Sequence, residues 1–224
     1  MELDLRGIPE TYALAEGEDA LWLLEQRLPG RVLSGKHPAH WFGPVAEWAA
    51  ELAARSGGSV RGGSWWADEA EAAAALSPEP LRPAVEAALE AVGDLPARRF
   101  HGDFQPKNVL LDRAQGVGVL DWEHAYEDGP PGLDLLFLAV MASSERPDGQ
   151  VLAALALGRD PDWAPLRSYL EHAGAGEAEL RSLLLAALAV WAADEQARVG
   201  APGMTRAEPM YRRLLLDLGP SLAA

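Results

Sequence analysis

The hydrophobic and polar positions divide the chain into a short extended part and a long helical part. Two apolar runs, Thr11–Ala15 and Ala20–Glu25, are separated by the acidic, glycine-containing stretch 16–19, which predicts a β-hairpin. Residues 26–30 follow as an extended or chain-reversing linker. From His40 onward the apolar residues recur at helical spacing, which predicts a mostly helical remainder.

After His40, the spacing of apolar residues predicts helices over most of the chain. We expect helices over residues 42–52, 64–76, 80–92, 133–144, 151–158, 163–173, 177–199 and 206–218. Ser64 is expected to cap the second helix, and Trp65 and Trp66 are expected to pack rather than form an aromatic ligand cage. The glycine-rich stretch 57–63 lacks the Lys-Ser/Thr pair of a phosphate-binding loop, so we interpret it as a flexible connection.

A second hairpin interrupts the helical pattern in the middle of the chain. We expect its strands over Asn108–Asp112 and Val117–Trp122, joined by a turn of ordinary length. The polar loop that precedes it contains His101, Asp103 and Lys107. The hairpin should therefore gather polar side chains from the loop and from both strand ends.

Composition and charge narrow the range of partners. The chain has 224 residues, with 34 acidic and 19 basic side chains and a formal net charge of −15. No basic stripe is present, so we expect neither a nucleic-acid partner nor an anionic membrane surface. The absence of cysteine excludes disulfides, thiolate catalysis and cysteine-ligated zinc. Without a signal-peptide core or a segment of transmembrane length, a soluble cytoplasmic protein is expected.

The polar residues of the central hairpin suit acid–base and metal chemistry. Asp103 is placed to act as a base. Asn108 and Asp121 should meet at the open end of the hairpin, where their oxygen atoms can hold a hard cation. Glu123 follows Asp121 by two positions, which places both acids on one strand face. Glu123 then assists the metal, binds a cationic substrate, or is only a solvated acid.

Two other enzyme classes fit the sequence less well. A serine hydrolase would need a Gly-x-Ser-x-Gly turn or another strained-serine signature, and the chain has none. Paired carboxylates also suggest a glycosidase. The asparagine after Asp103 and the acid on the second strand, however, fit metal and phosphate chemistry better.

The motif His101-Gly-Asp-Phe-Gln-Pro-Lys-Asn108, followed by Leu120-Asp-Trp-Glu123, resembles the motifs of the aminoglycoside phosphotransferase and choline kinase family. The resemblance implies an α+β, protein-kinase-like fold, in which a mostly helical C-terminal lobe carries the catalytic β-hairpin. It also implies an ATP-dependent phosphotransferase that acts on a hydroxyl group of a small molecule. Aminoglycosides, amino alcohols and sugar-like compounds all remain open as acceptors.

The family pattern implies roles for the residues of the motif. Asp103 would accept or orient the substrate hydroxyl, and Asn108 and Asp121 would bind Mg²⁺ that bridges the phosphates of ATP. Lys107 either reaches a phosphate or is a solvated loop lysine.

Three further residues receive supporting roles from the same resemblance. Backbone groups of the hinge around Gln26 would face the adenine edge. His101 would pack and hydrogen-bond beneath the loop rather than act as a base. Asp134, at the start of its helix, suits the helix N-terminus and would also brace the catalytic loop.

The resemblance also predicts a truncated N-terminal lobe. Residues 1–30 would form a remnant of the small nucleotide-binding lobe and the hinge, and residues 31–224 the helical catalytic lobe. The family places a covering loop, a strand lysine and a helix glutamate before this first hairpin, whereas only ten residues precede Thr11 and none is lysine. We therefore expect an upstream segment or a partner chain to supply the small lobe, and feeble ATP binding and transfer by these residues alone. The alternative is a kinase-like binding or regulatory protein without turnover.

Overall fold

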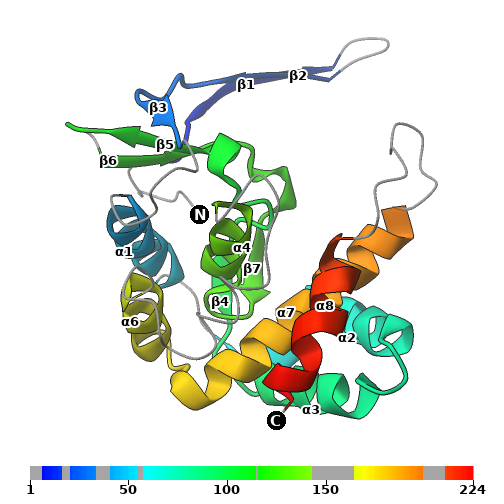
Figure 1. Ribbon diagram of the computed structural model, residues 1–224. Coiled ribbons are helices and arrows are strands. Elements are labelled where there is room, and N and C mark those ends of the chain that lie inside the picture. Colours follow the sequence, from blue (N-terminus) through cyan, green and yellow to red (C-terminus); the bar gives the residue numbers. More distant parts are fainter. Residues whose placement is uncertain are drawn as a thin grey trace.

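The computed structural model describes residues 7–16, 21–33, 41–54, 58–114, 116–142, 164–198 and 210–223. Strands β1, β2, β3, β5 and β6 lie together at one end of the molecule, and the helices form the body next to them (Figure 1). Strands β4 and β7 lie inside this body, beside helix α4 (Figure 1). This is the mostly helical α+β arrangement that the sequence predicts.

The strands of the described residues form three antiparallel sheets, ordered β1–β2, β3–β5–β6 and β4–β7. They are β1 (Thr11–Glu16), β2 (Leu21–Glu25), β3 (Arg31–Val32), β4 (Arg98–Phe100), β5 (Val109–Asp112), β6 (Gly116–Val119) and β7 (Tyr126–Gly129). Both predicted hairpins are therefore confirmed. The pattern did not predict β3, β4 and β7, because each has only two to four residues and pairs with a strand elsewhere in the sequence.

The helices of the described residues follow the predicted series closely. They are α1 (Phe42–Ala53), α2 (Ser64–Leu76), α3 (Arg82–Gly93), α4 (Leu133–Ala142), α6 (Ala164–His172), α7 (Glu177–Arg198) and α8 (Met210–Leu222). The helix expected over residues 151–158 lies outside the described residues. The expected end of the last helix at residue 218 was wrong, since α8 continues through Pro220 to Leu222. Within the described part, no helix is both long and apolar enough to cross a membrane.

Two expectations about the segment before α2 were also wrong. Gly63, with an extended backbone, occupies the N-cap position of α2, and Ser64 is already the first helical residue, one position too late to cap it. Residues Val60–Gly62, which we expected to be a flexible connection, form a short 3-10 helix. Val60 is fully buried in the core and donates its backbone N–H to the carbonyl of Leu95, which explains the ordered turn.

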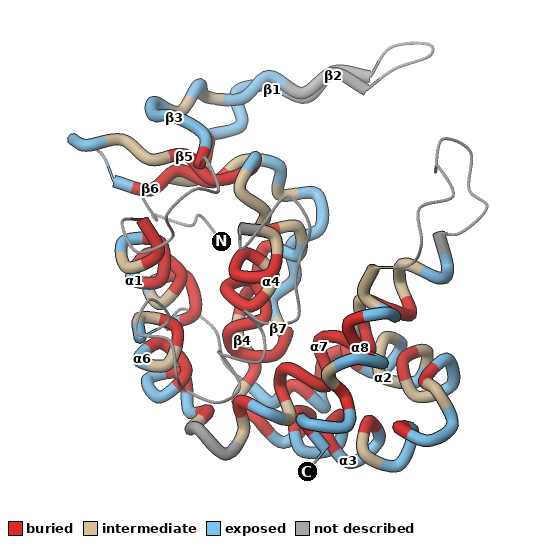
Figure 2. The backbone as a smooth tube through the Cα atoms, in the orientation of Figure 1, coloured by how far each residue is buried: buried red, intermediate tan, exposed pale blue. Residues whose placement is uncertain are grey.

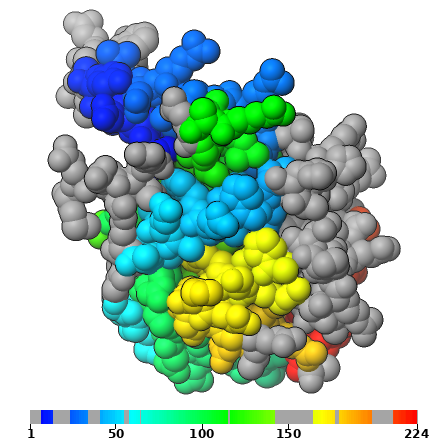
Figure 3. Space-filling view, turned by 90° about the vertical axis from the view of Figure 1, so that its left-hand side faces the viewer, coloured from blue at the N-terminus to red at the C-terminus, as the bar shows by residue number. Residues whose placement is uncertain are grey.

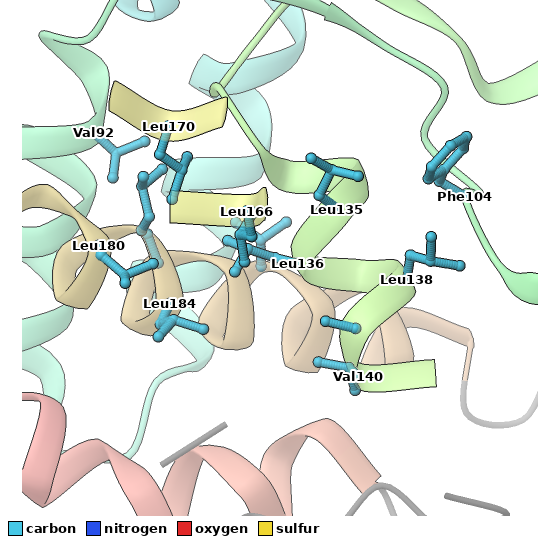
Figure 4. Close-up of a cluster of buried hydrophobic side chains, with 14 of the residues drawn as sticks. Val92, Phe104, Leu135, Leu136, Leu138, Val140, Leu166, Leu170, Leu180 and Leu184 are labelled. Atoms are coloured by element: carbon cyan, nitrogen blue, oxygen red, sulfur yellow. The ribbon is translucent and has the colours of Figure 1, made fainter. Parts of the chain in front are cut away.

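The core is centred on helix α4. Leu135, Leu136 and Leu138 of this helix are each 0% exposed, so α4 is apolar on more than one side and is a buried central helix. Its side chains pack with those of α6 and α7, and Figure 4 shows them beside Phe104 of the central loop. Figure 2 shows that most residues of α4 and α7 are buried, whereas the described residues of β1 are exposed. Helices α1 and α6 lie side by side over one face of this core (Figure 3).

Glu195 joins the start of α8 to α7. Its Oε1 accepts a hydrogen bond from the N–H of Met210 at 2.7 Å, and its Oε2 accepts one from the N–H of Tyr211 at 2.9 Å. Both N–H groups belong to the first turn of α8, where a helix offers no acceptors of its own and where a negative charge is favourable. Glu195 therefore fixes the position of Tyr211.

Glu195→Ala should lower the free energy of unfolding by about 0.5–2 kcal/mol, because it removes the acceptor of two N-terminal helix N–H groups. Urea denaturation of both proteins at pH 7 measures this change. Gln196→Ala is the matched control, since the hydrogen bond of the neighbouring Gln196 with the side chain of Arg212 lies at the surface. Equal stability of the two variants would contradict the anchoring role.

Candidate active site

A buried carboxylate holds the loop between β4 and β5. Asp134, in the first turn of α4, is 8% exposed, and its two oxygens accept hydrogen bonds from the backbone N–H groups of His101 at 2.6 Å and Gly102 at 3.1 Å. Burial raises the pKa of Asp134 to about 7, against the lowering effect of these two hydrogen bonds, and the charge of Asp103 raises it further. The start of the loop is thus fixed to the core helix.

Gly102 permits the sharp bend that follows. Its φ is 84°, and a Cβ at this position would lie 2.1 Å from the carbonyl oxygen of His124. Only glycine combines this left-handed backbone with so close an approach of a second backbone. The motif therefore needs Gly102 for geometry rather than chemistry.

His101 lies beneath the loop as a neutral ring. It is fully buried, and its Nε2 is 2.8 Å from the carbonyl oxygen of Leu120, so Nε2 must carry the hydrogen and donate it. Nδ1 is then free to accept the N–H of Asp103 at 3.2 Å. Burial lowers the pKa of His101 despite the hydrogen bond to Leu120 and the nearby acids, which favours this neutral form.

Aromatic side chains complete the support of the loop. Phe104 is 0% exposed and stacks on Trp48, with ring centroids 5.9 Å apart. The ring of Trp122 meets His101 edge-on at 4.8 Å and donates its Nε1 hydrogen to the carbonyl of Val119. The loop is therefore packed from below, and the side chains of Asp103, Gln105 and Lys107 line a cleft.

The carboxylate of Asp103 is the centre of a hydrogen-bond network. Gln105 Nε2 lies 2.7 Å from Oδ1 and 2.8 Å from Oδ2, and Asn108 Nδ2 lies 3.0 Å from Oδ2. Asn108 also donates to the backbone carbonyl of Asp103 at 2.9 Å. Lys107 Nζ is 3.9 Å from Oδ2, on a mostly exposed side chain. All these partners are donors, so they hold the carboxylate through its acceptor oxygens.

Asp121 adopts a backbone conformation that is rare for its residue type. Its φ of 68° makes it the one non-glycine residue with a positive φ among those described. Aspartate tolerates this left-handed region better than most residues, and such conformations cluster at functional sites. β6 has already ended at Val119, and Trp122–His124 form a short 3-10 helix. The expectation that Asp121 and Glu123 share a strand face was therefore wrong.

The loop borders an open cleft of about 670 Å³. Its aromatic lining consists of Trp65, Phe100, Tyr126, Phe137, Trp191 and Tyr211. Its acidic lining consists of Glu69, Asp103, Asp121, Glu123, Asp134 and Asp194, whereas Lys107 and His124 are the basic residues among the described lining. An excess of carboxylates beside aromatic faces favours a positively charged ligand.

The aromatic side chains form a group on each of two walls. Trp65 packs against Phe100 with ring centroids 4.8 Å apart, next to Tyr126 at 5.5 Å. On the wall made by α4, α7 and α8, Trp191 lies 5.3 Å from Phe137 and 5.4 Å from Tyr211. Trp66 is buried in the core as expected, whereas its neighbour Trp65 packs and also lines the cleft.

The structure brings most of the predicted site residues to this cleft. Asp103, Lys107, Asp121 and Glu123 line it, and Asn108 lies buried directly behind Asp103. Gln26 is not among the described lining residues. Its backbone N–H donates to the carbonyl of Glu10 at 2.7 Å, so that group closes the base of the first hairpin instead of facing a ligand.

Sequence reasoning missed several residues of the cleft. Trp191, Asp194 and Tyr211 lie on helices whose apolar spacing indicates only a core face, and nothing in the sequence shows which side of each helix meets the loop. Gln105 stands inside the recognised motif, but only the hydrogen bonds reveal its contact with Asp103.

The donor atoms at this site fit a hard cation better than a soft one. The described residues contain no cluster of three or more His, Asp or Glu side chains arranged for a metal. Asn108 directs its Nδ2 at Asp103, which leaves its amide oxygen for another partner, and Asp121 offers a carboxylate at the rim of the cleft. Two oxygen donors of this kind suit Mg²⁺ that takes its remaining ligands from substrate phosphates and water.

Comparisons with known proteins show the family and the fold of the chain. The model of the phosphotransferase enzyme family matches residues 3–169. The choline kinase LicA from Streptococcus pneumoniae is 13% identical with a TM-score of 0.60, over 97% of this chain and 74% of LicA. LicA in complex with AMP is similar with a TM-score of 0.57 and 14% identity, over 95% of this chain and 73% of that one.

Two further solved structures share the fold. A choline/ethanolamine kinase family protein from Mesorhizobium loti is 15% identical with a TM-score of 0.60, over 96% of this chain and 73% of that protein. A candidate aminoglycoside phosphotransferase from Ralstonia eutropha JMP134 is 19% identical with a TM-score of 0.53, over 98% of this chain and 76% of that protein. No curated protein matches. The predicted protein-kinase-like fold is thereby confirmed.

The pKa of Asp134 predicts a pH dependence of stability. Its carboxyl titrates near 3.8 when unfolded and at about 7 when folded, so the native state binds an extra proton between these values. The stabilisation from that proton is complete below about pH 4 and is lost as the pH rises through about 7. Asp134→Asn cannot titrate and should lack this slope.

Urea denaturation of the wild type and Asp134→Asn at pH 5, 6, 7 and 8 measures the effect. The free energy of unfolding of the wild type should fall relative to that of the variant as the pH rises. A constant difference between the two proteins across this range would show that Asp134 does not titrate within it.

Proposed function

Because the chain belongs to the phosphotransferase enzyme family, we propose that it transfers the γ-phosphoryl group of ATP to a hydroxyl group of a small cationic molecule. The single observation that carries this proposal is the carboxylate of Asp103, which amide donors hold at the wall of a cleft lined by acids and aromatic rings. The complex of LicA with AMP supports the use of a nucleotide.

Asp103 acts as the base of the reaction. It orients the acceptor hydroxyl and takes its proton as the hydroxyl oxygen forms a bond to the γ-phosphorus. The bond between that phosphorus and the bridging oxygen breaks at the same time, and ADP leaves. Gln105, Asn108 and Lys107 all direct donors toward the carboxylate, which holds it in position before the substrate arrives.

Asn108 and Asp121 hold Mg²⁺ for the nucleotide. The metal supplies positive charge that offsets the charge of the phosphates, which this acidic chain of net charge −15 otherwise repels. Lys107, at the edge of the cleft, adds a mobile cation near the transferred group. Since the N–H of Gln26 is already bonded to Glu10, the stretch around Gln26 would meet adenine through its remaining polar groups.

The acceptor carries a positive charge besides its hydroxyl group. Trp191, Tyr211 and Phe137 line the cleft together with Asp194, and Trp65 and Glu69 also line it. An ammonium group gains from both the carboxylate and the ring faces, most strongly where water is excluded. Amino alcohols, quaternary ammonium alcohols and amino sugars have this combination of groups.

A binding or regulatory protein without turnover is the second candidate. One observation favours it: β1, β2 and β3 carry no lysine that could hold the phosphates of a nucleotide. A chain that binds amino alcohols in the cleft but transfers no phosphate would support this alternative.

Incubation of the purified chain with Mg·ATP and a panel of acceptors tests the proposal. The panel pairs each amino alcohol or amino sugar with a neutral analogue, and ³¹P NMR identifies the phosphomonoester. Transfer to the cationic members supports the proposal. Binding in calorimetry without any phosphate transfer contradicts it and favours the second candidate.

Asp103→Asn should lower turnover by about 10²–10⁴-fold, the usual contribution of a positioned general base. The asparagine keeps the size of the side chain and one oxygen acceptor, so the free energy of unfolding should change little. Steady-state kinetics together with a thermal melt measures both effects. A folded variant with near-normal turnover would remove Asp103 from this role.

Asp121→Asn should raise the Mg²⁺ concentration needed for half-maximal activity by at least about 10-fold, because it removes one charged ligand. The fold should survive, since asparagine also tolerates the left-handed backbone of this position. Asp217→Asn, which removes an exposed acid of α8, is the matched control. An unchanged Mg²⁺ requirement in Asp121→Asn would argue against metal binding there.

Trp191→Leu should raise the KM for a quaternary ammonium alcohol by about 2- to 30-fold, because the loss of a cation–π contact costs about 0.5–2 kcal/mol. The KM for an uncharged alcohol of the same shape should change much less. Comparison of the two acceptors separates lost charge recognition from lost packing. Equal changes for both acceptors would mean that Trp191 does not recognise the cation.

A further inference from the structure

The side-chain amide of Gln105 spans the carboxylate of Asp103. Its Nε2 lies 2.7 Å from Oδ1 and 2.8 Å from Oδ2, so one amide group serves both oxygens. Gln105 also lines the cleft, directly beside the group that it contacts. The expected chemistry of the motif gives this residue no role.

The chain fixes the backbone of Gln105 as firmly as its side chain. Pro106 follows it, and a residue before proline is restricted to extended conformations, as the φ of −102° and ψ of 160° of Gln105 show. Its N–H donates to the carbonyl of Asp103 at 2.9 Å, and its carbonyl accepts the N–H of Asn108 at 2.9 Å. The backbone of Gln105 is therefore held in a rigid turn, from which its side chain reaches back to Asp103.

The carboxylate needs such a constraint. The last torsion of an aspartate side chain is soft, so hydrogen bonds must define the plane of its two oxygens. Asn108 bonds only Oδ2, and among the hydrogen bonds of the described residues Gln105 alone reaches Oδ1. The ion pair with Lys107 is long and mostly exposed, which makes it a weak restraint.

We propose that Gln105 is a positioning residue, which holds the carboxylate of Asp103 in one plane so that it meets the acceptor hydroxyl in a productive geometry. This inference rests on the proposed role of Asp103 as the base. Oδ2 accepts from both Gln105 and Asn108, whereas the described donors at Oδ1 are limited to Gln105, so Oδ1 keeps a lone pair that can accept the hydroxyl proton. The amide thus orients Asp103 without blocking it.

If Gln105 only positions Asp103, removal of its amide should lower kcat and leave KM nearly unchanged. Gln105→Met removes the donor but keeps the length of the side chain, and it should lower kcat by about 10- to 100-fold, the value of a hydrogen bond to a charged group. The KM for nucleotide and for acceptor should stay within about threefold, because the proposed binding contacts remain in place. Gln196→Met, on the exposed side of α7, is the control for the same substitution.

Gln105→Glu distinguishes hydrogen-bond donation from mere filling of space. Glutamate has nearly the shape of glutamine but offers an acceptor with a like charge to Asp103. If Gln105 acts by donation, Gln105→Glu should be more impaired than Gln105→Met. If Gln105 only fills space, the glutamate should be the milder change, and that order would overturn the proposal.

NMR gives a readout that does not depend on turnover. The side-chain amide hydrogens of Gln105, assigned by their loss in Gln105→Met, should have unusual shifts in the wild type and approach those of exposed glutamines in Asp103→Ala. Unchanged shifts would show that the contact is absent in solution and overturn the proposal.

The two hypotheses fail in different ways. A wild type that transfers no phosphate, or Asp103→Asn with normal turnover, would refute the proposed function, and the role of Gln105 would fall with it. Loss of turnover in Asp103→Asn together with normal kcat in both Gln105 variants would refute the role of Gln105 alone.

Discussion

The hydrogen bonds from the 101–108 loop to the carboxylate of Asp134 are the constraint on which the site depends. This carboxylate lies in the apolar core and accepts hydrogen bonds from two backbone N–H groups of the loop, so the loop is attached to the buried helix α4. The rest of the loop is positioned from that attachment. His101 lies beneath the loop, Asp103 lies above it, and Gln105 and Asn108 surround the carboxylate of Asp103. A buried acid is unfavourable by itself, and only its two donors make it tolerable.

The cleft and the charge of the chain act in opposite directions on the two substrates. Carboxylates and aromatic rings that line the cleft would attract the proposed cationic acceptor, and the same negative charge would oppose the proposed nucleotide. Near Asp103 the opposition is reduced locally, since amide donors and Lys107 surround its carboxylate. The acceptor site can therefore be strongly acidic while the place where phosphate arrives depends on neutral donors, one lysine and the proposed metal.

The sequence predicted the parts of the fold that local pattern determines. Both hairpins and the helices of the described residues follow from alternation, helical spacing and breakers. It missed β3, β4 and β7, whose few residues gain their strand character from distant partners. Asp103, Asn108 and Asp121 were predicted as site residues because two motifs, 101–108 and 120–123, hold them in a fixed order. The residues that line the rest of the cleft were not predicted. Trp191 and Tyr211 are brought to the loop by packing and by the anchoring of α8 through Glu195, which no local pattern reveals. The prediction that Asp121 and Glu123 share a strand face was wrong because β6 ends before both residues.

The glycine at position 102 has a mechanical consequence. A single added carbon there would reach within 2.1 Å of the His124 carbonyl, so the backbones of the 101–108 loop and the 122–124 turn touch with no side chain between them. Two backbones in such contact move as one solid piece, since no rotamer change can take up relative sliding. The 101–108 loop and the 122–124 turn therefore form one rigid unit beside the cleft, and a displacement of either segment would carry the other with it.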